Sequence, residues 1–203
     1  MVMQHLLYLH GFLSDENSIK GQFVKARMAE DWPQVKVHCM TYPIGQPKVS
    51  VGYIQNYIEY KLLSNSSNDK NLQWWVMGSS MGGYFAQYIA QVYQVPYIMI
   101  NPALDPVATL SAFMGQHQHP RTQEKFTIDE DYLEQLAAYQ VNLKAKERAL
   151  LLLDRGDEII DYRHALDKYQ DRCKTLVYER GDHAFQHLKA AWPQILAFLK
   201  SSS

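Results

Sequence analysis

Six short apolar runs divide the chain, and the segments between them are long enough to hold a helix each. The runs cover residues 5–9, 35–39, 72–77, 97–100, 149–153 and 175–178. Brief continuous runs of this kind are typical of strands that helices cover on both faces. Their alternation with helical segments indicates βαβ units. We therefore predict an α/β fold with a mainly parallel six-stranded sheet flanked by helices.

Two of the intervening segments, and the segment after the last run, carry apolar residues at helical spacing. They cover residues 53–62, 81–92 and 192–199. The last of these places Pro193 in its first turn, where proline is tolerated. A stretch rich in turn-forming residues, 64–70, separates the first of these helices from the third apolar run.

The interval between the fourth and fifth runs is too long for one crossover helix. It holds nearly fifty residues, of which 115–121 are polar and turn-like and 128–141 have a helical pattern. A structureless loop of that length is uncommon inside a compact domain. We therefore predict a single domain over residues 1–203, with a partly helical, lid-like insertion at about 102–148.

The sequence Gly-Ser-Ser-Met-Gly at 78–82 follows the third run and opens a helix. Small flanking residues let a strand and a helix approach each other closely. The sharp turn between them presents the Ser80 hydroxyl above the sheet edge, beside a helix N-terminus that stabilises negative charge. This setting predicts a nucleophile elbow. The alternative is a glycine-rich turn in which Ser79 or Ser80 caps the helix.

A serine nucleophile needs a base, and His183 is the histidine best placed to serve. It follows the sixth run, at a strand end from which its ring can reach Ser80. His187 lies one helical turn further on, and we expect it to face solvent or pack on the sheet. His117 and His119 have no third ligand nearby in the sequence, so we expect solvated loop histidines and no metal site.

The acid that orients the histidine is predicted to be Asp157. It follows Gly156, which can turn the loop over the sheet after the fifth run. Asp154 lies too near the strand end for easy reach, and Asp161 is placed to cap the helix that follows. Asp105, after the fourth run, stays open as an alternative. The resulting chain order of serine, acid and histidine is that of α/β-hydrolases.

The loop after the first run, Leu-His-Gly-Phe at 9–12, is expected to lie beside the elbow. The backbone amides of Phe12 and Met81 would then form a two-donor oxyanion hole. Losing one such donor typically costs about 3 kcal/mol of transition-state stabilisation. We expect His10 to brace this loop rather than to take part in the chemistry.

Composition and termini exclude several other classes of protein. The formal charge is −1, so there is no broad positive field to attract nucleic acid. No window reaches the eighteen apolar residues of a membrane span. Cys39 and Cys173 fit neither a disulfide framework nor a zinc site, and the N-terminus lacks the features of a signal peptide. We therefore predict a cytoplasmic protein with two free thiols.

Five sequence motifs together resemble the YqiA-type bacterial esterases, over residues 5 to nearly the C-terminus. The motifs are Leu-Tyr-Leu-His-Gly-Phe (7–12), Gly-Ser-Ser-Met-Gly-Gly-Tyr (78–84), Asn-Pro-Ala (101–103), Gly-Asp-Glu-Ile-Ile-Asp-Tyr-Arg (156–163) and Gly-Asp-His-Ala-Phe (181–185). The resemblance implies an α/β-hydrolase fold with strand order 2-1-3-4-5-6 and esterase activity on acyl esters. It also implies Ser80 as nucleophile, Asp157 as acid and His183 as base.

The sequence thus predicts a serine hydrolase that cleaves small carboxylic esters through an acyl-enzyme on Ser80, without cofactor or metal. A thioesterase with the same triad, and a non-catalytic binding module on the same scaffold, remain as alternatives. The oligomeric state stays open. If the insertion lines the pocket, four of its apolar residues would contact substrate; alternatively they pack on the sheet. These are Leu104, Leu110, Phe113 and Met114.

Overall fold

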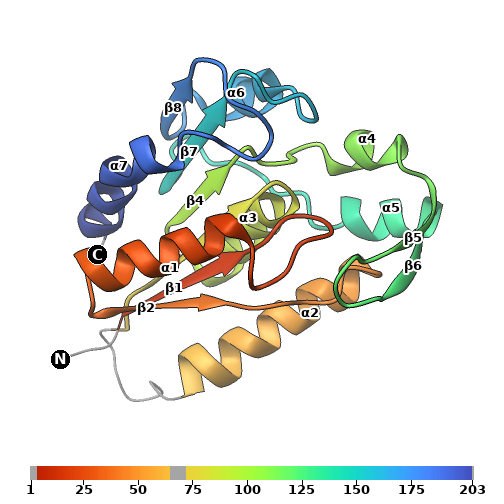
Figure 1. The fold of residues 1–203 in the computed structure, drawn as a ribbon, viewed down its shortest axis with the longest axis horizontal. Coiled ribbons are helices and arrows are strands. Elements are labelled where there is room, and N and C mark those ends of the chain that lie inside the picture. Colours follow the sequence, from red (N-terminus) through yellow and green to blue (C-terminus); the bar gives the residue numbers. More distant parts are fainter. Residues whose placement is uncertain (1–3, 65–71, 203) are drawn as a thin grey trace.

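The computed structural model describes residues 4–64 and 72–202, which build a twisted parallel sheet covered by helices (Figure 1). Every strand pair in this sheet is parallel. The spatial order is β2 (Val35–Cys39), β1 (Gln4–Leu9), β3 (Trp74–Ser79), β4 (Tyr97–Ile100), β7 (Ala149–Asp154) and β8 (Lys174–Tyr178). Both the predicted six-stranded sheet and the predicted strand order are confirmed.

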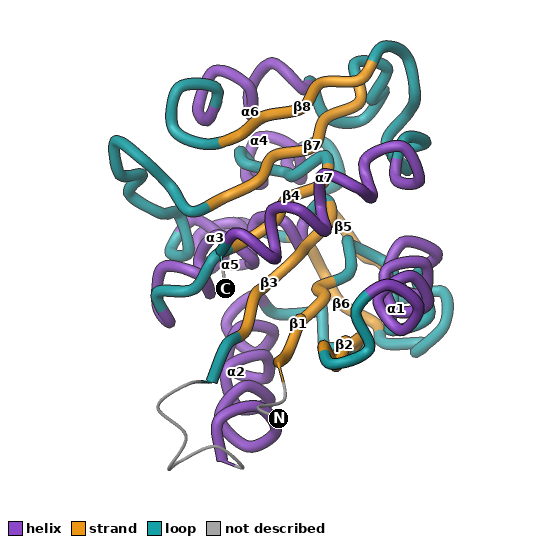
Figure 2. Tube along the Cα trace, turned by 90° about the vertical axis from the view of Figure 1, so that its left-hand side faces the viewer, coloured by secondary structure: helices purple, strands orange, loops and turns teal. Residues whose placement is uncertain are grey.

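Helices cover both faces of the sheet, which is why the central strands β1, β3, β4 and β7 are buried without alternation (Figure 2). One face carries α1 (Ile19–Asp31) and α7 (Leu188–Ser201). The other carries α2 (Pro47–Tyr57), the π-helical η1 (Ile58–Leu63), α3 (Met81–Tyr93) and α6 (Tyr162–Tyr169). In β1, Leu6 and Tyr8 pack towards α1 and α7, while Leu7 and Leu9 pack towards α2 and α3.

The predicted helices occur, with different boundaries. The segment 81–92 is α3, and 53–62 spans the end of α2 and most of η1. The last helix begins at Leu188, so Pro193 lies in its interior and the prediction of a first-turn proline was wrong. The missing N–H there costs one intrahelical bond. Burial of Trp192, Ile195 and Leu199 against the sheet holds the helix in place. Residues 65–70 of the predicted turn-rich stretch lie outside the described residues.

The long interval between β4 and β7 forms a separate group of elements at the carboxyl edge of the sheet (Figure 1). It contains α4 (Pro106–Ser111), an antiparallel hairpin and α5 (Glu130–Ala137). The hairpin pairs β5 (Gly115–Gln118) with β6 (Lys125–Ile128), so reading 115–121 as a turn was wrong for its first four residues. All four are polar or glycine and largely exposed, and therefore carry no apolar strand signal.

Two further observations concern the described part of the chain. None of its helices is both long and apolar enough to cross a membrane. Cys39 and Cys173 are both free thiols.

Candidate active site

Ser80 occupies a strained turn between β3 and α3. Its φ of 56° and ψ of −122° lie in a region that residues with a side chain rarely adopt. The surrounding backbone fixes this conformation. The Ser80 N–H donates to the Ile100 carbonyl at 3.0 Å, and the Ser80 carbonyl accepts from the amides of Gly83 (2.9 Å) and Ala103 (3.1 Å). The turn is thus held from the neighbouring strand as well as from its own helix.

Two glycines allow the close approach that this turn needs. A Cβ atom on Gly78 would lie 2.0 Å from the Gly82 carbonyl oxygen, and one on Gly82 would lie 2.2 Å from the Leu9 carbonyl oxygen. Real Cβ atoms do not come so close to backbone atoms, so a side chain at either position would push the backbone apart. The two glycines therefore bring the start of α3 against both its own strand and the end of β1.

The structure brings Ser80, His183 and Asp157 together at the carboxyl edge of the sheet. The His183 Nε2 atom lies 3.1 Å from Ser80 Oγ, and His183 Nδ1 lies 2.9 Å from Asp157 Oδ2. The Asp157 side chain is 1% exposed. Its Oδ1 atom also accepts from the amides of Ile159 (3.0 Å) and Ile160 (2.8 Å). The two backbone amides therefore hold the carboxylate in place independently of its bond to the imidazole.

The other acidic candidates are used elsewhere. Asp105 caps α4 by accepting from the Ala108 amide, and Asp161 caps α6, as predicted for Asp161. Asp154 pairs with His187, whose Nδ1 lies 2.7 Å from Asp154 Oδ1. His187 also stacks on Tyr178 with an interplanar angle of 10°, and its exposed fraction is 30%. The expectation that His187 would face solvent or pack on the sheet thus missed its carboxylate partner.

The loop that carries His183 is held by two buried polar side chains. Asp154 is fully buried, and its Oδ2 atom accepts from the Gln186 amide at 2.8 Å. Asn101 accepts from the Asp154 amide at 2.9 Å and donates to the carbonyls of Asp182 (3.0 Å) and His183 (3.3 Å). Asn101 and Asp154 thus hold the backbone on both sides of the His183 side chain.

Sequence reasoning assigned no role to Asn101 or to the Asp154–His187 pair. Two local signals point to them. Asn101 follows β4 directly and has a φ of 40°, a conformation that asparagine tolerates better than most residues. Gly181 has a φ of 76°, and a Cβ atom there would lie 1.9 Å from Asp154 Oδ2. The glycine before Asp182 is therefore required to seat the loop on the buried carboxylate.

Comparison with known proteins assigns the chain to a family. The model described as "Uncharacterised protein family (UPF0227)" matches residues 5–200. The chain belongs to this family. A UPF0227 protein of Klebsiella pneumoniae (strain 342) is 25% identical over 195 residues, covering 95% of this chain and 97% of the relative. UPF0227 protein YcfP of Escherichia coli O9:H4 is 22% identical with the same coverage. The predicted family resemblance is confirmed.

Solved structures show that this UPF0227 member has the α/β-hydrolase fold. Est1E from Butyrivibrio proteoclasticus, solved with ferulic acid bound, superposes with a TM-score of 0.75 at 14% identity, covering 99% of this chain and 90% of that one. A putative hydrolase from Agrobacterium vitis S4 superposes with a TM-score of 0.74 at 17% identity, covering 97% of this chain and 88% of that one. At these identities the comparison establishes the fold.

In this UPF0227 chain the loop after β1 lies directly against the elbow. A Cβ atom on Gly11 would lie 3.2 Å from Ser80 Cβ, so Phe12 is placed beside the serine. Met81 is the first residue of α3, and its amide therefore has no acceptor within the helix. Phe12 lines the same cavity as Ser80, and Met81 follows Ser80 directly, so both residues lie near the serine and their role as oxyanion donors stays a prediction.

His10 braces this loop from within the protein. Its side chain is 1% exposed, and its Nδ1 donates to the Gly11 carbonyl at 2.8 Å. The ring stacks on Tyr42 at 4.1 Å, and the Tyr42 hydroxyl donates to the His10 carbonyl. Burial lowers the pKa of His10 to about 4. The ring is therefore neutral at neutral pH.

His117 and His119 lie on the hairpin of the insertion. His119 is 1% exposed, and its Nε2 donates to the Ser14 carbonyl at 2.9 Å, so the expectation of a solvated histidine there was wrong. The His117 Nε2 donates to the Phe113 carbonyl at 2.6 Å. Across residues 4–64 and 72–202, no group of three or more His, Cys, Asp or Glu side chains is placed to hold a metal ion.

Ser80 and His183 open into a cavity of about 630 Å³ between α1, α7 and the loop after β1. The four insertion residues expected to contact a substrate do not line it. Leu104 and Leu110 are buried in the hydrophobic core, and Phe113 and Met114 are about half exposed. The insertion contributes Arg121 instead.

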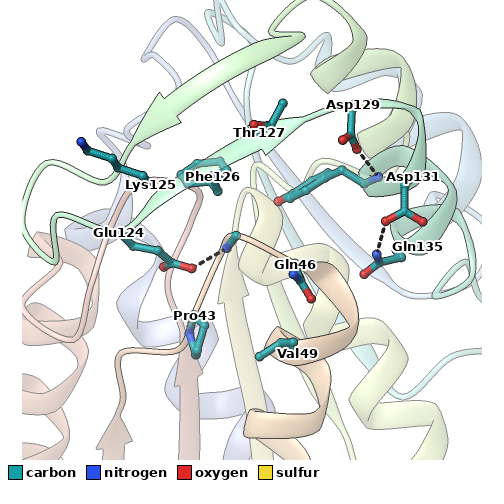
Figure 3. Close-up of a pocket in the computed structure, with 12 residues that line it drawn as sticks. Pro43, Gln46, Val49, Glu124, Lys125, Phe126, Thr127, Asp129, Asp131 and Gln135 are labelled. Atoms are coloured by element: carbon teal, nitrogen blue, oxygen red, sulfur yellow. Dashed lines mark hydrogen bonds between the residues drawn. The ribbon is translucent and has the colours of Figure 1, made fainter.

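A second hollow of about 400 Å³ lies between the start of α2 and the insertion (Figure 3). It holds no serine, cysteine or histidine. Its carboxylates already have partners, since Glu124 accepts from the Gly45 amide, Asp129 caps α5 and Asp131 accepts from Gln135. The bond to Gly45 fastens the insertion to the rest of the fold, and the other two bonds lie within the insertion. The hollow thus offers no pair comparable to Ser80 and His183.

Proposed function

We propose that the protein is a serine hydrolase that cleaves small carboxylic esters through an acyl-enzyme intermediate on Ser80. The observation that carries the proposal is the continuous hydrogen-bond chain from Ser80 Oγ to His183, at 3.1 Å, and on to Asp157, at 2.9 Å. A serine hydroxyl with a base in reach, and a base with an orienting acid, is the arrangement that activates a weak oxygen nucleophile.

The first half-reaction follows from the directions of these bonds. The carboxylate of Asp157 can only accept, so His183 carries its proton on Nδ1 and leaves Nε2 free to accept the Ser80 proton. As that proton moves to Nε2, Oγ forms a bond to the ester carbonyl carbon. The carbonyl oxygen becomes negative and is stabilised by the amides of Phe12 and Met81, each contributing about 3 kcal/mol.

The intermediate then collapses and the ester bond breaks. His183 gives its Nε2 proton to the departing alcohol oxygen, which leaves the acyl group on Ser80. A water molecule takes the alcohol's place, loses a proton to Nε2 and attacks the acyl carbon. Release of the carboxylic acid returns the proton to Ser80. Every proton thus passes through one ring nitrogen.

A fluorophosphonate probe and 4-nitrophenyl butyrate together test this proposal. We expect the wild-type protein to be labelled and to turn over the ester, and Ser80→Ala to lose both. Ser79→Ala is the matched control, because Ser79 is the neighbouring buried serine and makes no hydrogen bond with His183, whose Nε2 faces Ser80. Ester turnover by Ser80→Ala would contradict the proposal. An unlabelled, folded wild-type protein would favour a non-catalytic module.

The same triad can also cleave thioesters, so the substrate class needs its own experiment. We expect the oxygen ester of a given acyl group to be cleaved with a kcat/KM at least as high as that of its thioester. A thiolate leaves more readily than an alcohol oxygen, so the oxygen ester can keep pace only if His183 protonates the departing oxygen, as proposed. Faster cleavage of the thioester would show instead that the protein is a thioesterase.

A further inference from the structure

The cavity that contains Ser80 is lined by more cations than anions. Lys20 reaches it from the first turn of α1, Lys189 from the first turn of α7 and Arg121 from the insertion. Asp15 is the only carboxylate in the lining, and Arg121 lies 3.2 Å from it. Arg121 and Asp15 offset each other, which leaves the two lysines.

Neither lysine is paired with a carboxylate within ion-pair distance in the described part of the chain. The Lys20 ammonium donates to the Ala184 carbonyl at 3.0 Å, which uses one of its three protons. Burial lowers the pKa of Lys20, and the more distant carboxylates of Asp182, Asp157 and Asp154 oppose that shift. A half-buried ammonium without a counter-ion is well placed to bind an anion.

Two long helices add to this positive field. Both α1, of 13 residues, and α7, of 14 residues, begin at the cavity wall. The unsatisfied amides and the dipole of a helix favour negative charge at its N-terminus. The two lysines therefore lie where the backbone also attracts an anion.

Tyr8 supplies an independent observation at the same wall. Its side chain is 1% exposed and lines the cavity, and its ring lies beneath the first turn of α1. Its hydroxyl makes no hydrogen bond of normal geometry with any described residue, although Ser18 and Ser79 lie nearby. Buried hydroxyls nearly always have a partner. An acceptor atom of a ligand beside α1 would provide one.

We propose that the ester cleaved here carries an anionic group, a carboxylate or a phosphate, on a part of the molecule that does not react. Lys20, Lys189 and the N-terminus of α1 bind that group, and the Tyr8 hydroxyl donates to it. Apolar side chains of the same cavity, among them Phe12 and Phe23, contact the carbon skeleton. This substrate class rests on the proposed function, since it presumes that Ser80 cleaves esters.

Matched pairs of esters that differ only in charge test the proposal. For the acyl side, the pair is a 4-nitrophenyl ester of adipic acid with a free terminal carboxylate and its terminal amide. For the alcohol side, it is the butyryl ester of 4-hydroxybenzoate and that of 4-hydroxybenzamide, with the ester of 4-hydroxyphenyl phosphate as a third compound. We expect an anionic compound to exceed its neutral counterpart about tenfold in kcat/KM, mainly through a lower KM. The ratio should fall at about 0.5 M salt.

Two substitutions locate the anion-binding group. We expect Lys20→Gln and Lys189→Gln each to lower the anionic-to-neutral ratio about threefold or more. Lys25→Gln is the matched control, because it removes an exposed lysine from the same helix, outside the cavity, and should leave the ratio unchanged. Circular dichroism of each variant verifies that it is folded. Lys189 is exposed, so its substitution does not disturb packing.

The outcomes separate this inference from the proposed function. Turnover of neutral and anionic esters at equal rates, with normal probe labelling of Ser80, would overturn the anionic substrate class alone. A preference that survives both lysine substitutions would overturn the assignment to Lys20 and Lys189. Failure to cleave any ester, together with failure of Ser80 to react with the probe, would instead overturn the proposed function.

Discussion

Two Asp–His pairs lie side by side at the carboxyl edge of the sheet, built from the same two loops. In one, Asp157 lies 2.9 Å from His183; in the other, Asp154 lies 2.7 Å from His187. Their carboxylate side chains are 1% and 0% exposed. The chemistry of the two pairs is the same. What differs is the second ring nitrogen of each histidine.

The His183 Nε2 atom faces Ser80 Oγ, whereas His187 Nε2 has no hydrogen-bond partner among the described residues. A carboxylate–imidazole pair thus gains a chemical role only from the group that faces the second ring nitrogen of its histidine. The pair at Asp154 serves instead to hold the loop of the other pair, together with Asn101. Substitutions in the first pair should therefore impair turnover, and substitutions in the second should impair stability.

The largest effect is expected for His183→Gln. The side chain keeps a polar group but cannot take up and return the Ser80 proton, so kcat for 4-nitrophenyl butyrate should fall by about 10³-fold or more. The free energy of unfolding in urea should change by no more than about 1 kcal/mol, because Asp157 keeps its two backbone amide donors when the imidazole is lost. Retained turnover would show that another group acts as the base.

Asp157→Asn should have the second-largest effect, a loss of about 10³-fold in kcat. The amide places a donor against Nδ1 and favours the ring tautomer that cannot accept from Ser80. Asp105→Asn is the matched control, because Asp105 caps α4 and makes no contact with His183. Equal activity of the two variants in the same assay would contradict the role given to Asp157.

For Asp154→Asn we expect the opposite result, a large loss of stability and a smaller loss of turnover. The buried carboxylate accepts from the Gln186 amide and from His187, so the substituted amide either places a donor against the Gln186 amide or forces His187 into its other ring tautomer, and the charge-assisted bonds are lost. We expect a loss of about 3 kcal/mol in the free energy of unfolding, measured with urea. The fall in kcat should be smaller than for Asp157→Asn. A larger fall in kcat for Asp154→Asn than for Asp157→Asn would show that both pairs take part in catalysis.

Unlike His183 and His187, His10 is fully buried and has no carboxylate partner. Burial lowers its pKa to about 4, below the ordinary value of 6.5. Between these values the unfolded chain binds more protons than the folded one, so stability falls as the pH drops from 6.5 to about 4. The contribution of His10 to this loss should be about 3 kcal/mol.

Urea unfolding across this pH range measures the effect. His10→Gln should have a flatter stability profile than the wild type. His164→Gln, which removes an exposed histidine of α6, should leave the profile unchanged. An unchanged profile in His10→Gln would show that burial does not lower the pKa of His10.

The smallest effect is expected for His187→Gln. The ring is 30% exposed and its loss removes one hydrogen bond to Asp154. We expect a destabilisation of about 1 kcal/mol in urea unfolding and a fall of less than about tenfold in kcat/KM. A loss of turnover as large as that of His183→Gln would contradict the division of labour between the two pairs.

Local signals made the sheet and the grouping of Ser80, Asp157 and His183 predictable from sequence. The four central strands are largely apolar because both of their faces are buried, and Gly78 and Gly82 mark a close approach that admits no side chain at either position. Ser80, Asp157 and His183 each come soon after a strand of the sheet. Parallel strands bring their carboxyl ends to one edge, so chain order was enough to place the three residues together.

Features that depend on contacts between distant segments could not be predicted. The thirteen residues of α1 bury only Gly21, Val24 and Met28, too few for an apolar stripe. The hairpin begins with four residues that carry no strand pattern. His119 is buried because its ring bonds to Ser14, which is 105 positions away. Pairing of Asp154 with His187 likewise depends on how closely two loops approach.

The most direct test of the account is identification of the acyl-enzyme. The protein is mixed with 4-nitrophenyl butyrate, quenched with acid during turnover and digested, and the peptides are analysed by mass spectrometry. We predict a butyryl group on Ser80, absent from Ser80→Ala, which should also fail to release 4-nitrophenol above background. Undiminished ester cleavage by Ser80→Ala, or a butyryl group on another residue during turnover, would contradict the account.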